Sequence, residues 1–129
     1  MSLPVEKSQL FEMDVTGQFG WYVDEAGEEV AWRLLAAVEV TLAKLRKQPE
    51  MGTLRRFRNP LLQGLRSFRV EPPFDKLLVF YRPIEQTLQA WRLMHGARDL
   101  PRRLVEPRDQ FLKALAKVPH VEQEEHDKL

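Results

Sequence analysis

The sequence predicts an α+β fold in which a helical hairpin packs on a small antiparallel sheet, in the order β-α-α-β-β-β, with an extra C-terminal helix. Two apolar stripes with helical spacing occupy residues 9–48. Three short segments of strand composition follow between residues 65 and 95. A chain of 129 residues, 43% of them apolar, is long enough for one ordinary domain with its own core.

The chain is predicted to open with a strand and a first helix. Residues 3–7 form the strand, which Pro4 confines to an edge or a strand start. Ser8 is the expected N-cap of the helix. The apolar face of this helix recurs every three or four residues, at Phe11, Val15, Phe19 and Tyr22. A strand over residues 11–15 is the competing interpretation, but its alternation stops after five residues, whereas the helical pattern continues for three turns.

Gly27 breaks the chain before a second predicted helix. Its apolar stripe consists of Val30, Leu34, Val38, Leu42 and Leu45. Two glutamates stand at its start and three basic residues at its end, which complements the helix dipole. Pro49 ends the pattern, so residues 9–48 are interpreted as two helices joined by a tight turn.

Three predicted strands, at residues 65–71, 76–82 and 87–95, come after a basic, irregular stretch over residues 51–63. The separators between them have the length of hairpin loops, so an antiparallel meander is expected. The middle segment is apolar on both faces, which is typical of a central strand covered from both sides.

A short amphipathic helix is predicted between Pro107 and Pro119, followed by an acidic tail over residues 121–129. We therefore expect one main domain over residues 1–104 and a C-terminal helical extension with an acidic tail over residues 105–129.

The charge of the chain is strongly segregated, although the formal net charge is only +1. Residues 1–42 hold 2 basic and 8 acidic residues, residues 43–104 hold 14 and 5, and residues 105–129 hold 4 and 6. The balances are −6, +9 and −2, which sum to +1. This distribution predicts a basic working surface in the middle of the chain.

Composition excludes several classes of function. The chain has no cysteine, so disulfides, thiolate metal sites and cysteine nucleophiles are excluded. No apolar run approaches the ~20 residues that cross a bilayer, and we expect a cytoplasmic protein with no membrane partner. His120 and His126 stand beside carboxylates, but in a polar tail with no fixed geometry. No metal site and no cofactor are predicted.

Four local patterns together resemble the RelE/ParE toxins of type II toxin–antitoxin systems, and in particular the ParE-like branch. They are QFGWY at 18–22 followed by EAG at 25–27, QPEMG at 48–52, GLRSFRV at 64–70 followed by VFYR at 79–82, and HGARDLP at 95–101. The resemblance covers residues 3–104. It rests on the order and spacing of the patterns, since each alone is weak.

The resemblance implies a growth inhibitor that is neutralised by a cognate antitoxin and that meets operon DNA only through this antitoxin. Ribonuclease members of the family cut messenger RNA on the ribosome, whereas ParE members are associated with inhibition of DNA gyrase. Many ribonuclease members carry a tyrosine five positions after a histidine, but here Leu100 stands five positions after His95. The gyrase target is therefore favoured. The alternatives are an mRNA endonuclease and an inactive member that only binds its antitoxin.

The resemblance also implies two sets of site residues. The expected target-binding residues are Arg66, Arg69, Arg82, Arg92, His95 and Arg98. If the protein were a nuclease, its catalytic residues would be His95, Arg82, Arg66 and Arg98. The expected antitoxin-binding residues are Trp21, Tyr22, Leu34 and Val38. A purely structural role for His95 remains an equal alternative, and only about half of the strand arginines are expected to meet a partner.

Overall fold

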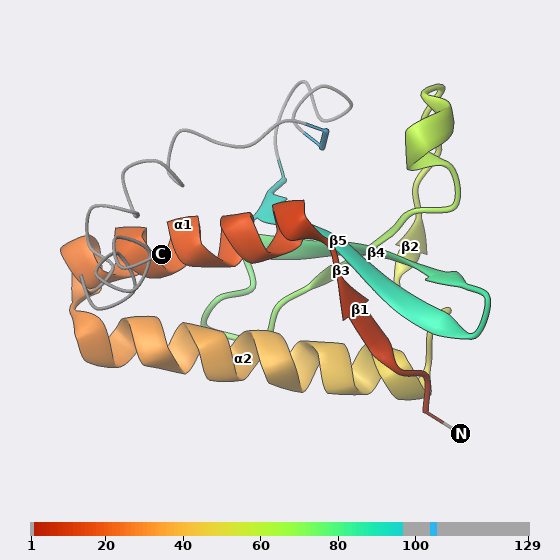
Figure 1. Ribbon diagram of the computed structural model, residues 1–129. Helices are drawn as coiled ribbons and strands as arrows, with labels where there is room; N and C mark the ends of the chain where they lie inside the picture. The colour runs from red at the N-terminus through yellow and green to blue at the C-terminus, as the bar shows by residue number, and fades with distance from the viewer. Residues whose placement is uncertain (1, 97–103, 106–129) are drawn as a thin grey trace, which may run out of the picture.

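Two helices pack on one face of a five-stranded mixed sheet in the computed structural model of the chain, so the predicted α+β class is confirmed (Figure 1). The structure describes residues 2–96 and 104–105. The predicted C-terminal helix and tail lie outside the described residues. No helix in the described part of the chain is long and apolar enough to cross a membrane.

The helical hairpin consists of α1, Gln9–Ala26, and α2, Glu28–Lys47. Ser8 is the N-cap of α1, because its Oγ accepts a hydrogen bond from the Phe11 backbone N–H at 3.0 Å. The helical interpretation of residues 11–15 is thus confirmed, and the strand alternative is wrong. Gly27 alone joins the helices, with a φ of +96° that other residues rarely adopt.

The sheet has the strand order β1-β5-β4-β3-β2. The predicted meander is present as β3, Arg66–Arg69, β4, Leu77–Ile84, and β5, Thr87–His95. A two-residue strand that was not predicted, β2, Thr53–Leu54, adds to the far side of β3. The opening strand β1, Val5–Lys7, pairs with β5 in parallel, so the sheet is mixed and the expectation of a purely antiparallel sheet is wrong. The direction of β1 is set by its pairing with β5, the last strand. The sequence of residues 5–7 alone does not specify this direction.

The β4–β5 turn is shorter than the sequence predicts. Glu85 and Gln86 form a two-residue loop with φ of 47° and 65°, so β4 continues through Pro83 to Ile84. Proline is tolerated there because β3 pairs with β4 only as far as Tyr81, and no hydrogen bond to β3 is lost.

The sheet separates two apolar clusters. On the face that carries the helices, called here the helix face, α1 and α2 pack against Leu77, Val79 and Tyr81 of β4. On the opposite face, called the far face, Phe80 of β4 belongs to a second cluster. The other buried members of this second cluster are Leu62, Leu65, Met94 and Leu104. The prediction that the middle strand is covered on both sides is therefore confirmed.

A buried ion pair joins α1 to β5. Asp14 Oδ2 and Oδ1 accept from Arg92 Nε at 2.6 Å and Nη2 at 2.9 Å, and Oδ2 also accepts from the Leu93 backbone N–H at 3.0 Å. The side chains of Arg92 and Asp14 are 0% and 2% exposed. A bidentate pair that also satisfies a backbone donor fixes the position of the helix against the strand.

The loop after α2 is held by a buried tyrosine. Tyr81 Oη donates to the Pro49 carbonyl at 2.7 Å and accepts from the Gly52 backbone N–H at 2.8 Å. Burial raises the pKa of Tyr81, so its phenol keeps the proton that it donates. This contact explains why a glycine ends the QPEMG segment, since a side chain at position 52 would collide with the tyrosine.

Gly52→Ala should destabilise the fold by roughly 1–3 kcal/mol, because overpacked sites relax only at a cost. The new Cβ would lie 2.6 Å from Tyr81 Oη and 2.9 Å from the Ser67 carbonyl oxygen. Urea denaturation measures the change. Gly96→Ala is the matched control, since its Cβ would meet nothing closer than Leu78 Cδ1 at 3.4 Å. Equal stability of the two variants would contradict the prediction.

Candidate functional site

The arginines of β3 lie on opposite faces of the sheet. Arg66 pairs with Tyr81 and therefore lies on the helix face, where its Nη1 donates to the Gly52 carbonyl at 2.9 Å. Arg69 pairs with Leu78, whose side chain packs on the far face, and it is exposed. The two predicted target-binding residues of this strand therefore face different surroundings.

Arg82 is a half-buried clamp on the far face. Its Nε donates to Gln89 Oε1 at 2.9 Å, its Nη1 donates to the Gln63 carbonyl at 2.7 Å, and its guanidinium lies 5.4 Å from the centre of the Trp91 ring. Burial lowers the pKa of Arg82 from its ordinary value. These contacts link β4 and β5 to Gln63, which directly follows the short 3₁₀ helix η1, Pro60–Leu62.

Arg92, predicted to bind the target, lies in the core and not on the surface. Its side chain is fully buried against Asp14. The alternation of apolar and polar residues along this strand allowed the Arg92 side chain to point either to solvent or into the core. The buried carboxylate decides the direction, because an arginine is stable inside the protein only when it is paired.

His95 and Arg82 lie on opposite faces. His95, the last residue of β5, pairs with Leu77 on the helix face and is half-buried. Arg98 lies outside the described residues. In the described part of the chain, the predicted proton carrier therefore does not share a face with the far-face arginines that could bind phosphate.

The four expected antitoxin-binding residues divide into a surface pair and a core pair. Trp21 is 42% exposed, and its ring lies 4.9 Å from that of Tyr22, edge to face. Tyr22 is half-buried against Phe74. Leu34 and Val38, at 0% and 2% exposure, are core residues under the sheet. In the chain as described, these two side chains pack α2 on the sheet and offer no exposed surface to a partner.

A second apolar stripe runs along the outer side of α2. Trp32, Ala36 and Val40 recur every four residues and are exposed, with Trp32 at 57% and Val40 at 47%. The Trp32 ring lies 5.1 Å from that of Phe19 of α1, edge to face. Sequence analysis missed this stripe, although apolar residues at spacing four beside a complete core stripe signal it.

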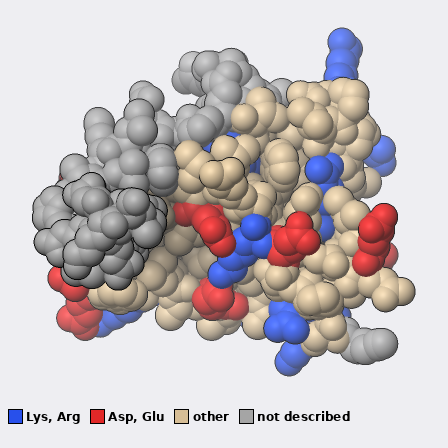
Figure 2. Space-filling model, viewed as in Figure 1, with Lys and Arg blue, Asp and Glu red and all other residues tan. Residues whose placement is uncertain are grey.

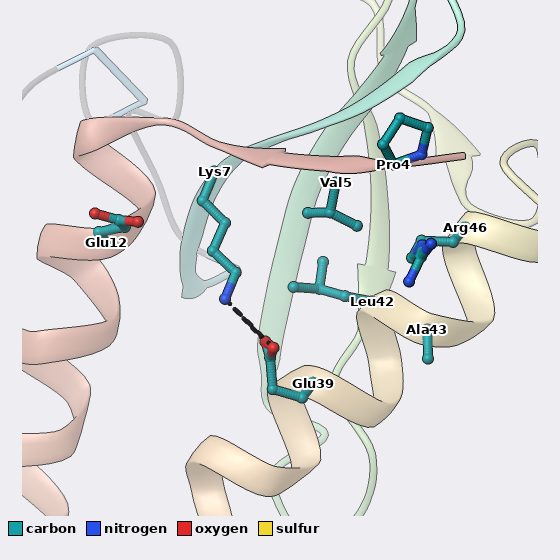
Figure 3. A pocket seen from close by; sticks show the side chains of 8 residues that line it. All are labelled: Pro4, Val5, Lys7, Glu12, Glu39, Leu42, Ala43 and Arg46. Carbon is teal, nitrogen blue, oxygen red and sulfur yellow. Dashed lines mark hydrogen bonds and ion pairs between the residues drawn. The ribbon is translucent and has the colours of Figure 1, made fainter. Parts of the chain in front are cut away.

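A groove of about 570 Å³ lies between β1 and α2 (Figure 3). Lys7 Nζ and Glu39 Oε2 meet across it at 3.0 Å. Its full lining is Pro4, Val5, Lys7, Glu12, Glu39, Leu42, Ala43 and Arg46. Apolar walls with charged groups of both signs suit an amphipathic peptide better than a small ion.

Two further features were missed in the sequence. Asp14 is a carboxylate within the apolar face of α1, and this position signals a buried partner. Arg55, Arg56 and Arg58 fall in the stretch that was interpreted only as basic and irregular.

No group of three or more acidic or histidine side chains among the described residues could hold a metal ion. The histidines of the tail lie outside those residues.

Comparison with known proteins gives one family and two similar structures. The family model of the ParE toxin of the type II toxin–antitoxin system, parDE, matches residues 5–100. A chain of the chromosomal ParDE toxin–antitoxin system from P. aeruginosa is similar in structure, with a TM-score of 0.61 and 17% identity over 74% of this chain and 98% of that chain. A chain of the toxin–antitoxin complex RelBE2 from Mycobacterium tuberculosis has a TM-score of 0.49 and 18% identity over 74% of this chain and 100% of that chain. No curated protein matches the sequence.

Proposed function

Because the chain belongs to the ParE toxin family of type II toxin–antitoxin systems, we propose that it inhibits growth by acting on DNA gyrase and is neutralised by a cognate antitoxin. One observation carries the choice of gyrase over messenger RNA. A nuclease needs a proton carrier beside the groups that stabilise the transferring phosphate, whereas His95 and Arg82 lie on opposite faces of the sheet. Arg66 shares the face of His95, but it pairs with Tyr81 of β4 while His95 pairs with Leu77, four residues away along that strand.

The filling of the far face also supports this choice. Where a nuclease would need an open surface for RNA, Leu62, Leu65 and Leu104 cover Phe80 and Met94. Arg82 has two of its donors engaged by Gln89 and a backbone carbonyl. Among the strand arginines first considered, the exposed one is Arg69, and we propose that it meets the target.

The antitoxin is proposed to bind the helical hairpin from outside. Trp21 and the outer stripe of α2 offer exposed apolar side chains, as the centre of a protein interface requires. The groove between β1 and α2 adds cations, Lys7 and Arg46, for acidic residues of an antitoxin segment. A segment that folds as it binds would suit this surface.

The purified chain should inhibit DNA supercoiling by gyrase and leave ribosome-bound messenger RNA intact. Arg69→Ala should weaken the inhibition severalfold, because it removes an exposed charge without breaking an internal contact that the structure records. Arg33→Ala, which removes an exposed arginine of α2, is the charge-matched control and should leave the inhibition unchanged. Supercoiling assays and primer extension on ribosomal complexes measure both activities.

Cleavage of the message with normal supercoiling would replace the gyrase proposal by the nuclease alternative. Tight binding of the antitoxin with neither activity would identify an inactive member of the family.

A further inference from the structure

The edge of the sheet formed by β2 and β3 is exceptionally rich in arginine. Residues 53–70 contain five arginines and no lysine, aspartate or glutamate. Four of them, Arg55, Arg56, Arg58 and Arg69, are called here the arginine edge; the fifth, Arg66, points to the helix face. Figure 2 shows lysine and arginine but no acidic side chains at the upper right, where β2 and η1 lie in Figure 1.

None of the residues of the arginine edge forms an ion pair within the described residues. The ion pairs recorded there use Lys7, Arg33, Lys44 and Arg92 instead. The sequence supplies no carboxylate between positions 53 and 70. The positive charge of this edge is therefore uncompensated locally, which favours an anionic partner.

The edge is held in place by the sheet. Arg55 donates from its backbone N–H to the Leu65 carbonyl at 2.8 Å and from Nη1 to Ser67 Oγ at 3.2 Å. Its guanidinium lies 5.9 Å from the centre of the Phe57 ring and 5.7 Å from that of Phe80. Arg69 stands two residues beyond Ser67 on the same face of β3, about 7 Å away at the usual rise of a strand. An anchored guanidinium and an exposed one thus share the far face.

The two remaining arginines project from the segment after β2. Exposure alternates from Arg55 to Arg58, with Arg56 and Arg58 exposed and Arg55 and Phe57 half-buried. Arg56 and Arg58 are therefore the two side chains that this segment presents to solvent. The phosphates of one strand of duplex DNA recur every ~3.4 Å along the helix axis, so two neighbouring side chains can reach different phosphates.

We infer that the arginine edge binds the phosphate backbone of nucleic acid. Guanidinium groups match phosphate oxygens bidentately, and contacts of this kind need no base sequence. Uncompensated charge repeated along an edge fits a polyanion better than it fits a single acidic side chain. The inference goes beyond the proposed function, since it concerns what residues 55–69 bind and holds whether or not gyrase is the target.

The experiment measures the binding of the purified full chain to a fluorescent 20-bp DNA duplex and to a 20-nucleotide single-stranded RNA, from low to physiological salt. Arg56→Gln/Arg58→Gln should weaken binding roughly tenfold at low salt and reduce the slope of log K against log salt by about two. The control, Arg33→Gln/Lys47→Gln, removes the same charge from exposed positions of α2 and should leave both quantities unchanged. Unfolding midpoints verify that both variants fold.

Each result decides the inference. Binding of the duplex, the RNA or both, with loss only in the arginine-edge variant, supports it and identifies the source of the phosphates. It is overturned if neither nucleic acid binds at low salt, or if the control loses as much affinity as the arginine-edge variant. Poly-glutamate that binds through these arginines when nucleic acid does not would assign the edge to an acidic protein. Failure of gyrase inhibition with normal nucleic-acid binding would reject the proposed function alone.

Discussion

Asp14→Ala should lower the free energy of unfolding by about 3–5 kcal/mol, because it removes the buried carboxylate that neutralises the buried guanidinium of Arg92. The carboxylate accepts two hydrogen bonds from the guanidinium and one from the Leu93 backbone N–H. These three hydrogen bonds are lost in the variant, because alanine has no side-chain acceptor. Urea denaturation, followed by circular dichroism, measures the loss.

Two variants serve as controls for this prediction. Glu12→Ala removes an exposed carboxylate from the same helix and should change stability by less than about 0.5 kcal/mol. Asp14→Leu/Arg92→Met replaces the pair by apolar side chains and should recover most of the loss, since the pair fixes the docking of α1 more than it adds stability. If Asp14→Ala were as stable as Glu12→Ala, the ion pair would have no structural role.

Leu34→Ala should cost about 2–5 kcal/mol of stability, because it empties a fully buried position between α2 and the sheet. The affinity of the folded fraction for the antitoxin should stay close to that of the unchanged chain, since no Leu34 atom is exposed to a partner. Stability is measured by urea denaturation, and affinity by titration with the antitoxin under conditions where both variants are folded.

Trp21→Ala should have the opposite effect to Leu34→Ala: antitoxin affinity should fall while stability is kept. Its side chain is 42% exposed, so its loss should change stability little but weaken antitoxin binding tenfold or more if it anchors the interface. Trp32→Ala tests the outer stripe of α2 in the same way. A Leu34→Ala variant that kept its stability but lost the antitoxin would return this residue to the contact surface.

The sequence was most informative where the residues that determine a feature are neighbours in the chain. Ser8, Gly27 and the two apolar stripes determine the helical hairpin, since capping, left-handed backbone and helical periodicity are properties of neighbouring residues. The doubly apolar pattern of residues 77–81 likewise identified the central strand. The family followed from four short patterns, and the QPEMG pattern has a physical basis in the contact between Gly52 and Tyr81.

The site was predicted less well, because a strand arginine gives no local sign of which way it faces. Arg66, Arg69 and Arg92 all fit a basic surface in the sequence, yet one points to the helix face, one to solvent and one into the core. The surroundings of Arg66 and Arg92 depend on residues 14 and 78 positions away, which are Gly52 and Asp14.

By itself, then, the sequence determined the helices, the meander, the family and the segregation of charge, all of which are written in residues that are close in the chain. Only the tertiary structure decided that β1 runs parallel to β5, that Arg92 is a core residue, that His95 is separated from Arg82, and that the arginine edge has no acidic partner among the described residues. The physical reason is that strand direction, burial and charge compensation depend on which distant segments pack together, and local sequence does not specify those contacts.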